Sequence, residues 1–230
     1  MASPRASAQA PMTDTEEQKR AAAEAAALLV KDGDRIGLGT GSTVAHLLPA
    51  LAARGLSLRC VATSPATEHA ARELGLVIED LDELVRLDIA IDGADQIDPE
   101  GWLVKGGGGA HTHEKIVAAA SRRFVVIASA EKAVAELCPP VPLEILRFGA
   151  QATLSLIGHA RLRDVAPSPE DNLIADYFGP IEDARELAVR LADTPGVVDH
   201  GLFAPEMVSD ILIATNDGVE HRQLKRGQRA

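Results

Sequence analysis

Aromatic residues are scarce in this chain of 230 residues: they make up 3% of it, so the core must be packed with alanine, valine, isoleucine and leucine. No apolar run approaches the roughly 20 residues that span a bilayer, so we expect no membrane partner. Basic residues are also few, since 23 Lys and Arg stand against 34 Asp and Glu, a formal net charge of −11. This balance argues against a nucleic-acid partner, because phosphate backbones bind basic surfaces. It leaves room for a small anion, which a few amides and lysines in one pocket can hold.

Cysteine is nearly absent, and Cys60 and Cys138 match no metal-binding or redox spacing. We expect two buried, reduced thiols and a cytoplasmic location. Residues 1–12 lack the hydrophobic core of a secretory signal and are expected to form a disordered extension, with an organelle transit peptide as the alternative. The basic end, residues 221–230, is expected to be a frayed, solvated tail.

Strands and helices alternate along the first part of the chain. This order predicts an α/β fold with a doubly wound, mostly parallel, Rossmann-like sheet. Pro49 should kink the second helix or end it early. The predicted helices are 16–30, one from Ser42 or Thr43, 64–75 and 112–123, and the predicted strands are 35–39, 56–63, 76–80, 87–91, 102–104 and 124–129.

The pattern changes between residues 141 and 204, where we expect the order strand, helix, strand, strand, helix, strand. That order is the ferredoxin-like arrangement. The apolar run 211–215 can then rejoin the first sheet. We therefore predict a discontinuous main domain of residues 13–140 and 206–230, interrupted by a small ferredoxin-like α+β domain of residues 141–205.

The first motif is GLGTGST, residues 37–43, at a predicted strand-to-helix turn. Glycines let the backbone approach an anion, and amides at a helix N-terminus point toward it. A dinucleotide fingerprint would have glycine or alanine where Ser42 stands, and no Walker lysine follows. The loop therefore predicts a site for a single phosphate, with a tight turn that binds nothing as the alternative.

The second motif is IDGAD, in which Asp92 and Asp95 follow a strand expected to be buried. Open parallel sheets bind their ligands at the carboxyl ends of the strands. Asp-Gly is also a common turn dipeptide, so a solvated turn remains the alternative.

The third motif is KGGGGAHTHEK, which begins at Lys105. Four consecutive glycines are costly in conformational entropy, so their backbone is expected to approach a ligand and offer amides to a developing oxyanion. Glu114 falls in the first turn of the next helix, where the helix dipole should keep its carboxylate ionised and able to act as a base. Stabilisation of the helix end alone is the alternative.

His111 and His113 lie beside Glu114, but their spacing lacks the helical i, i+4 geometry of HExxH zinc sites. We therefore predict no metal site. Lys132 follows a strand and is a candidate contact for the phosphate, whereas Lys19 lies on the first helix, where solvated lysines are common.

Taken together and in this order, the motifs resemble ribose-5-phosphate isomerase of the A type. The resemblance implies an aldose–ketose isomerase of the pentose phosphate pathway that interconverts D-ribose 5-phosphate and D-ribulose 5-phosphate through a cis-enediolate. It further implies no metal or organic cofactor and a homodimer, with a tetramer as the alternative. The matching stretches lie between residues 18 and 218 and are GLGTGSTVAHLL, IDGADQID, KGGGGAHTHEKI, PVPLEIL, TPGVVDHGLFA and NDGV.

The resemblance also implies roles for the candidate residues. Glu114 would move the proton between carbons 2 and 1, and Asp92 would assist ring opening. Asp95 and Lys105 would orient the substrate and stabilise the enediolate. His111 and His113 depart from the family pattern, which leaves the pH optimum open. The expected substrate-binding residues are Thr40, Gly41, Ser42, Thr43, Gly106, Gly107, Gly108, Lys132 and Lys19.

Other functions remain to be weighed. A non-catalytic sugar-phosphate sensor is expected to lack some of the acid/base residues, whereas Asp92, Asp95, Lys105 and Glu114 are all present. An amino-sugar phosphate isomerase or a CoA transferase is the other enzyme alternative. A transferase would form a thioester on Glu114, which hydroxylamine would trap.

Overall fold

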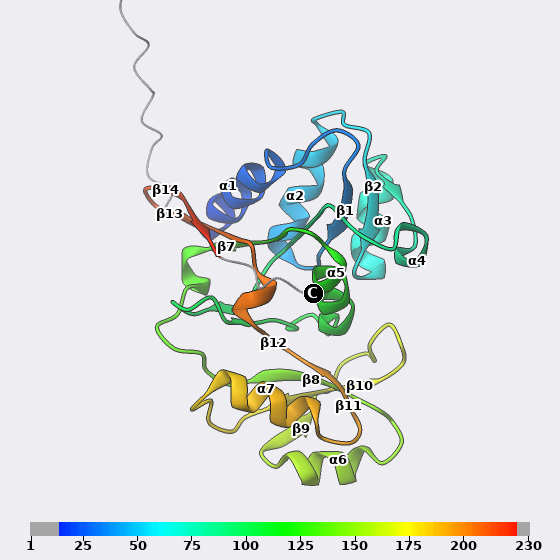
Figure 1. Cartoon of the computed structure of the whole chain (residues 1–230), viewed down its shortest axis with the longest axis vertical. Coiled ribbons are helices and arrows are strands. Elements are labelled where there is room, and N and C mark those ends of the chain that lie inside the picture. The colour runs from blue at the N-terminus through cyan, green and yellow to red at the C-terminus, as the bar shows by residue number, and fades with distance from the viewer. Residues whose placement is uncertain (1–13, 225–230) are drawn as a thin grey trace, which may run out of the picture.

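The computed structural model describes residues 14–224, so the predicted extension of residues 1–12 lies outside the described part of the chain. Seven strands form the main sheet, in the order β14-β13-β7-β4-β1-β2-β3, and every neighbouring pair is parallel except β13 with β14 (Figure 1). These strands are β1 (Arg35–Leu38), β2 (Arg59–Ala62), β3 (Val77–Ile78), β4 (Ile89–Asp92), β7 (Phe124–Ser129), β13 (Asp210–Thr215) and β14 (Gly218–Gln223).

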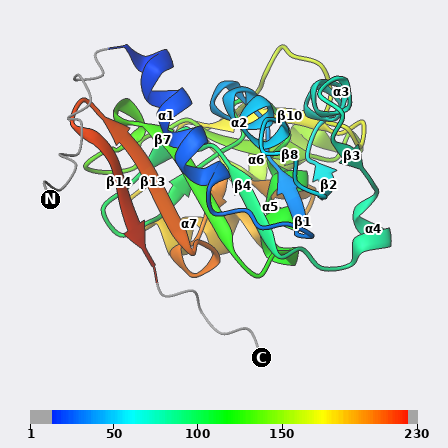
Figure 2. The same ribbon diagram turned by 90° about the horizontal axis from the view of Figure 1, so that it is seen from above.

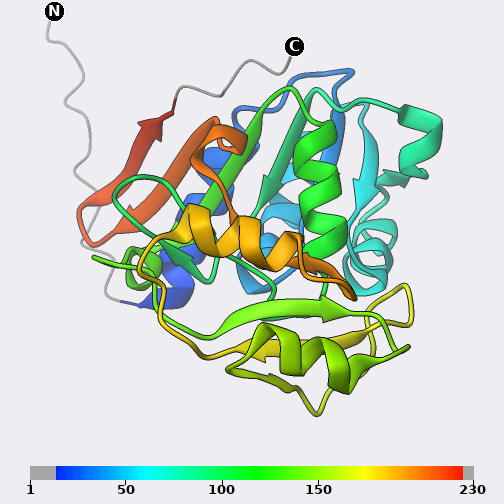
Figure 3. The same cartoon turned by 60° about the horizontal axis from the view of Figure 1, so that its bottom comes forward.

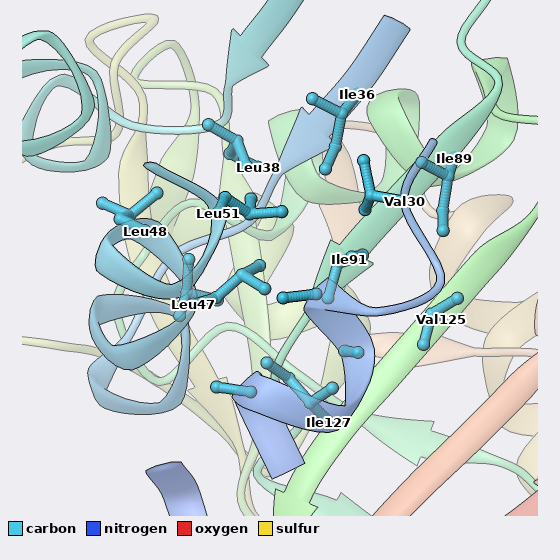
Figure 4. Packing of buried hydrophobic residues seen from close by; sticks show 14 of the residues in the cluster. Val30, Ile36, Leu38, Leu47, Leu48, Leu51, Ile89, Ile91, Val125 and Ile127 are labelled. Carbon is cyan, nitrogen blue, oxygen red and sulfur yellow. The ribbon is translucent and has the colours of Figure 1, made fainter. Parts of the chain in front are cut away.

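Helices cover both faces of this sheet, which confirms the predicted doubly wound α/β class (Figure 3). Side chains alternate between faces along each strand. Val125 and Ile127 of β7 pack against the helices on one face, as Figure 4 shows, whereas Val126 and Ala128 pack toward α5 on the other. The helices beside the main sheet are α1 (Thr15–Ala27), α2 (Ser42–Ala52), α3 (Pro65–Glu73), α4 (Leu81–Leu84) and α5 (His111–Ala120).

Local sequence explains the helix boundaries. Ser64 caps α3 by accepting a hydrogen bond from the Thr67 amide, and Pro65 occupies the first turn, where no partner for its nitrogen is needed. Of the two effects expected of Pro49, an early end of α2 does not occur, because the helix continues to Ala52. A proline inside a helix costs about 3 kcal/mol. The burial of Leu48 and Leu51 on either side of it recovers about as much.

A second, four-stranded sheet carries the predicted ferredoxin-like arrangement. Its order is β11-β8-β10-β9, and all neighbouring pairs are antiparallel. The division of the chain into domains at residues 141 and 205 stays a prediction. The elements of this part are β8 (Val141–Ile145), α6 (Ala150–Ile157), β9 (Ala160–Leu162), β10 (Leu173–Tyr177), α7 (Ala184–Ala192) and β11 (Val197–His200).

A small third sheet joins the two larger ones and was not predicted. It consists of β5 (Gln96–Ile97), β6 (Leu103–Val104) and β12 (Leu202–Phe203). The last strand expected between residues 141 and 204 is in fact two strands, β11 and β12, because the chain changes sheets at Gly201. A Cβ at Gly201 would lie 2.1 Å from the Lys105 carbonyl oxygen, so only glycine permits this crossing. The Lys105 amide donates to the Gly201 oxygen at 2.8 Å.

Two further expectations are corrected at the surface. Residues 221–223 belong to β14 at the edge of the sheet (Figure 2) and are not frayed, because they pair with β13 and His221 contacts Asp210 at 2.7 Å. Cys60 is buried, but Cys138 is exposed in the loop before β8, where its amide bonds the Gln96 side chain. Among residues 14–224, no helix is both long and apolar enough to span a bilayer.

Candidate active site

A cavity of about 150 Å³ lies at the carboxyl ends of β1 and β4. The chain order reverses between these two adjacent strands, and open α/β sheets bind ligands at such a switch point. The cavity brings together nearly all the residues singled out in the sequence. Its lining comprises Thr40, Gly41, Ser42, Thr43, Gly93, Ala94, Asp95, Lys105, Gly106, Gly107, Gly108, Glu114 and Lys132.

Three buried charges meet at this cavity. Asp92 ends β4, Lys105 follows β6, and Glu114 lies in the first turn of α5. The Lys105 ammonium lies 2.9 Å from Asp92 Oδ2 and 3.1 Å from Glu114 Oε2, and it also donates to the Gly93 carbonyl at 2.6 Å. All three side chains are at most 5% exposed. One cation is therefore shared between two carboxylates away from water.

Burial raises the pKa of Glu114 to about 7, the nearby Asp92 carboxylate adds to the rise, and Lys105 offsets it only in part. Burial likewise raises the pKa of Asp92. Burial alone would lower the pKa of Lys105, but its two acidic neighbours raise it, so the ammonium stays charged. The expectation that the helix dipole keeps Glu114 fully ionised is wrong, because burial and Asp92 outweigh that effect. A carboxyl group that titrates near neutrality can both take and return a proton.

The GLGTG turn leaves space for the Asp92 carboxylate and donates a hydrogen bond to it. A Cβ at Gly39 would lie 1.9 Å from Asp92 Oδ1, so a side chain there would displace the carboxylate. The same oxygen accepts hydrogen bonds from the amides of Thr40 at 3.1 Å and Gly93 at 2.7 Å. From the sequence, this loop as a whole is predicted to bind a phosphate. The structure shows that it makes room for an acidic side chain of the next motif.

The loop at the start of α2 is open to an anion. Gly41 is the N-cap residue, and no side chain caps the helix, so the first amides are not bonded by a capping group. Gly41 and Ser42 are exposed at the cavity. Lys132 reaches the same cavity and lies 3.4 Å from Glu131. Lys19 does not line it and instead forms an ion pair with Glu16 at 2.6 Å.

The two histidines of the third motif point to other partners. His111 is buried, its Nε2 lies 3.4 Å from the Asp199 carbonyl oxygen, and burial lowers its pKa to about 4. His113 contacts the exposed Glu170 at 3.0 Å. Within residues 14–224, no three His, Cys, Asp or Glu side chains are grouped as a metal site requires.

Several supporting residues could not be identified from sequence. Thr67 donates its hydroxyl hydrogen to the Gly39 carbonyl at 2.9 Å, and Thr63 lies 2.8 Å from the Thr40 hydroxyl. From the second sheet, Glu144 reaches Thr112 on α5, and Arg163 reaches the glycine run. These contacts join segments far apart in the chain, and no local motif signals them.

A larger groove of about 660 Å³ lies between α3, α4 and α5 and contains none of this machinery. Acidic side chains dominate its lining, so it would repel a sugar phosphate. The basic residues of the lining are Arg72 and His113, and the acidic ones are Glu68, Glu79, Asp80, Asp82, Glu83 and Glu170.

Comparison with known proteins agrees with this geometry. A sequence model of the ribose 5-phosphate isomerase A (phosphoriboisomerase A) family matches residues 59–218. The chain is 45% identical to ribose-5-phosphate isomerase A of Caulobacter vibrioides, covering 90% of this chain and 98% of that one. It is 42% identical to the Gluconobacter oxydans protein of the same name, with 91% and 97% covered.

Solved structures give the same result. The ribose 5-phosphate isomerase A of Methanocaldococcus jannaschii superposes with a TM-score of 0.86 at 35% identity, covering 91% of this chain and all of that one. A D-ribose-5-phosphate isomerase in complex with phospho-erythronic acid superposes with a TM-score of 0.86 at 33% identity, covering 92% of this chain and all of that one. The chain therefore belongs to the ribose-5-phosphate isomerase A family and is an isomerase of sugar phosphates.

Proposed function

We propose that this enzyme interconverts D-ribose 5-phosphate and D-ribulose 5-phosphate through a cis-enediolate, with Glu114 as the proton-transferring base. The observation that carries the proposal is the position of Glu114: buried on the cavity wall, 3.1 Å from Lys105, with a pKa raised to about 7 by burial and Asp92. A base with this pKa is half ionised at neutral pH and can both accept and return a proton.

In the forward direction, Glu114 takes the proton from carbon 2, and the electrons of that C–H bond form a double bond between carbons 1 and 2. The aldehyde oxygen on carbon 1 becomes the oxyanion. Lys105 and the amides of the glycine run stabilise that charge. A proton then moves from the hydroxyl on carbon 2 to the oxygen on carbon 1, and Glu114 returns its proton to carbon 1. The product is the ketose.

Asp92 and Asp95 serve the steps on oxygen. Asp92 shares the Lys105 ammonium with Glu114, and we assign it to ring opening and proton movement among the hydroxyls. Asp95 is more exposed, and its Oδ2 accepts the Gly107 amide hydrogen at 2.8 Å, so it lies where it can orient the sugar. None of these steps routes through a metal or an organic cofactor.

The phosphate end of the substrate is proposed to bind at the start of α2. Gly41, Ser42 and Thr43 supply amides there, Thr40, Ser42 and Thr43 supply hydroxyls, and Lys132 supplies positive charge. Lys19 would join them only by leaving its ion pair with Glu16. The complex of a relative with phospho-erythronic acid, a phosphorylated sugar acid, supports a site of this kind.

The experiment is conversion of ribose 5-phosphate to ribulose 5-phosphate by purified enzyme, with and without EDTA, beside Glu114→Gln. Glu170→Gln, an exposed glutamate that contacts α5, is the matched control. We expect turnover that survives EDTA, is retained by the control and is lost in Glu114→Gln, with substrate affinity kept within about tenfold because the lost interaction is with the transition state. Binding without turnover by the wild type would favour the sugar-phosphate sensor, and normal turnover by Glu114→Gln would remove that residue from the mechanism.

We also propose a cytoplasmic homodimer, with residues 141–205 as a separate domain at the subunit interface. The family resemblance supports the dimer. Sedimentation of the 24.2 kDa chain would test it, with a tetramer as the other outcome. A variant lacking residues 141–204 is expected to be monomeric, and an intact dimer would contradict the interface.

A further inference from the structure

The glycine run after Lys105 has no side chains with which to fix its own conformation. Gly106 has a φ of +105° and Gly109 of +75°, so the backbone follows a path that other residues rarely adopt. Free glycine backbone is the most mobile in a protein chain, yet oxyanion stabilisation requires amides held in place before reaction. Some other group must therefore hold this segment.

Arg163 of the second sheet is in contact with the run. It follows β9, and its Nη1 donates to the carbonyl oxygen of Gly107 at 2.9 Å and to that of Gly106 at 3.3 Å. Its Nε donates to Asp176 Oδ2 at 2.9 Å, and its Nη2 donates to Asp176 Oδ1. The side chains of Arg163 and Asp176 are 19% and 13% exposed. The bidentate pair orients the planar guanidinium so that Nη1 faces the two carbonyls.

Peptide planarity transmits this contact to the cavity. In a trans peptide, the C=O and the following N–H point in opposite directions. Because the Gly106 carbonyl points to Arg163, the Gly107 N–H points away from it, and it does so onto Asp95 Oδ2 at 2.8 Å. By the same rule, the Gly107 carbonyl on Arg163 turns the Gly108 N–H away from the arginine. Both glycines line the catalytic cavity.

We infer that Arg163, oriented by Asp176, is a positioning residue that holds the Gly107 amide on Asp95 and leaves the Gly108 amide to the enediolate. The inference rests on the proposed function. It gives the second sheet a part in the reaction, although neither Arg163 nor Asp176 lines the catalytic cavity.

A purely structural role would also follow from these contacts, since Arg163 links the two halves of the molecule. The roles differ in what a substitution changes. A structural arginine affects stability, whereas a positioning arginine affects the transition state, where the oxyanion forms, more than the bound aldose. Loss of positioning therefore lowers kcat with little change in KM.

The test is steady-state isomerisation of ribose 5-phosphate by Arg163→Gln, Arg163→Lys and Asp176→Asn. Arg161→Gln is the matched control, an exposed arginine on β9 whose guanidinium lies over the Phe178 ring. We expect kcat of Arg163→Gln to fall about 10²-fold with KM within about threefold, comparable to the loss of one oxyanion donor. Arg163→Lys should recover part of that loss, because lysine can reach a carbonyl but cannot form the planar pair with Asp176. The kcat of Asp176→Asn should lie between those of Arg163→Gln and Arg163→Lys, and the kcat of Arg161→Gln should match that of the wild type.

Hydrogen exchange of the segment 103–110 gives a second readout that does not depend on activity. We expect faster exchange of this segment in Arg163→Gln, with exchange of β7 unchanged. Unchanged kcat and unchanged exchange in a folded Arg163→Gln would overturn the inference, as would equal loss in Arg161→Gln. If Arg163→Gln does not fold, Arg163→Lys decides the matter by the same two measurements. An inactive wild type would refute the proposed function, while the exchange result would still test the positioning.

Discussion

Two glutamates are buried beside the first turn of α5, and their pKa values are shifted in opposite directions. Glu114 lines the candidate active-site cavity and is 5% exposed, and Glu144 on β8 is 1% exposed. Burial raises the pKa of Glu114 to about 7. Burial alone would also raise the pKa of Glu144, but hydrogen bonds from Ser168, Thr112 and Asn172 hold it below its usual value.

The supply of hydrogen-bond donors accounts for the difference. Glu144 accepts hydrogen bonds from the Ser168 hydroxyl at 2.6 Å, the side-chain amide of Asn172 at 2.8 Å and the Thr112 hydroxyl at 2.5 Å. Glu114 has Lys105 at 3.1 Å and must share that cation with Asp92. A buried carboxylate that is fully hydrogen-bonded stays ionised and stabilises the fold. One that lacks donors is left to exchange a proton.

The largest effect is expected from Glu114→Gln. Loss of the base should lower kcat by about 10²- to 10⁴-fold.

The same substitution should change stability. The folded state raises the pKa of the Glu114 carboxyl, so its ionised form destabilises the protein above the folded pKa. Stability should therefore fall as pH rises from about 4.5 to about 7 in the wild type, and the glutamine variant should escape this loss. Denaturant unfolding at pH 8 should find Glu114→Gln more stable by up to about 3 kcal/mol. Lower stability there would contradict the comparison.

Glu144→Gln should lower stability and leave kcat nearly unchanged, the opposite of what we expect for Glu114→Gln. Its three donors lose a charged acceptor, and we expect a loss of about 2 kcal/mol in the free energy of unfolding at pH 8. The folded pKa of Glu144 is lowered, so its stabilisation is present above the ordinary glutamate value and is lost as pH falls through the folded pKa. The difference between variant and wild type should therefore shrink on acidification. The kcat of the folded variant should stay within about threefold, and a loss as large as that of Glu114→Gln would break the distinction.

Ser168→Ala sharpens the comparison at a smaller scale, because it removes one of the three donors and leaves the carboxylate in place. The Ser168 hydroxyl also accepts a hydrogen bond from the backbone N–H of Asn172 at 3.2 Å, which holds the loop before β10. We expect a loss of about 1 kcal/mol in unfolding free energy. Ser155→Ala, whose exposed hydroxyl bonds the Gln151 carbonyl within α6, is the control and should be near neutral. An equal loss of unfolding free energy in Ser168→Ala and Ser155→Ala would show that the hydrogen bond to Glu144 adds no stability beyond that of an exposed serine.

The proposed base, Glu114, could be predicted from sequence, whereas Glu144 could not. Asp92, Lys105 and Glu114 follow strands or open a helix, and the carboxyl ends of parallel strands meet at one edge of a sheet, so their grouping follows from local patterns. Glu144 meets Thr112 across 32 residues and Arg163 meets Gly107 across 56, and nothing local marks either pair.

Sequence periodicity also predicted the α/β class and the ferredoxin-like order, since each depends on element type alone. It missed the crossing at Gly201, where one glycine lets the chain change sheets. It also misjudged Pro49 and Cys138. The burial of Leu48 and Leu51 beside Pro49 and the hydrogen bond from the Cys138 amide to the distant Gln96 side chain are tertiary features, which periodicity does not record.

The most direct test of the account is the pH dependence of kcat/KM for ribose 5-phosphate between pH 5 and pH 9, in the wild type and in Glu114→Gln. Glu114 must be ionised in the free enzyme to accept the proton, so kcat/KM of the wild type should be level above pH 7 and fall about tenfold per unit below it. The residual kcat/KM of Glu114→Gln should show no such ionisation. A wild-type kcat/KM that stays level down to pH 5, or the same ionisation persisting in the variant, would contradict the assignment of Glu114 as the base.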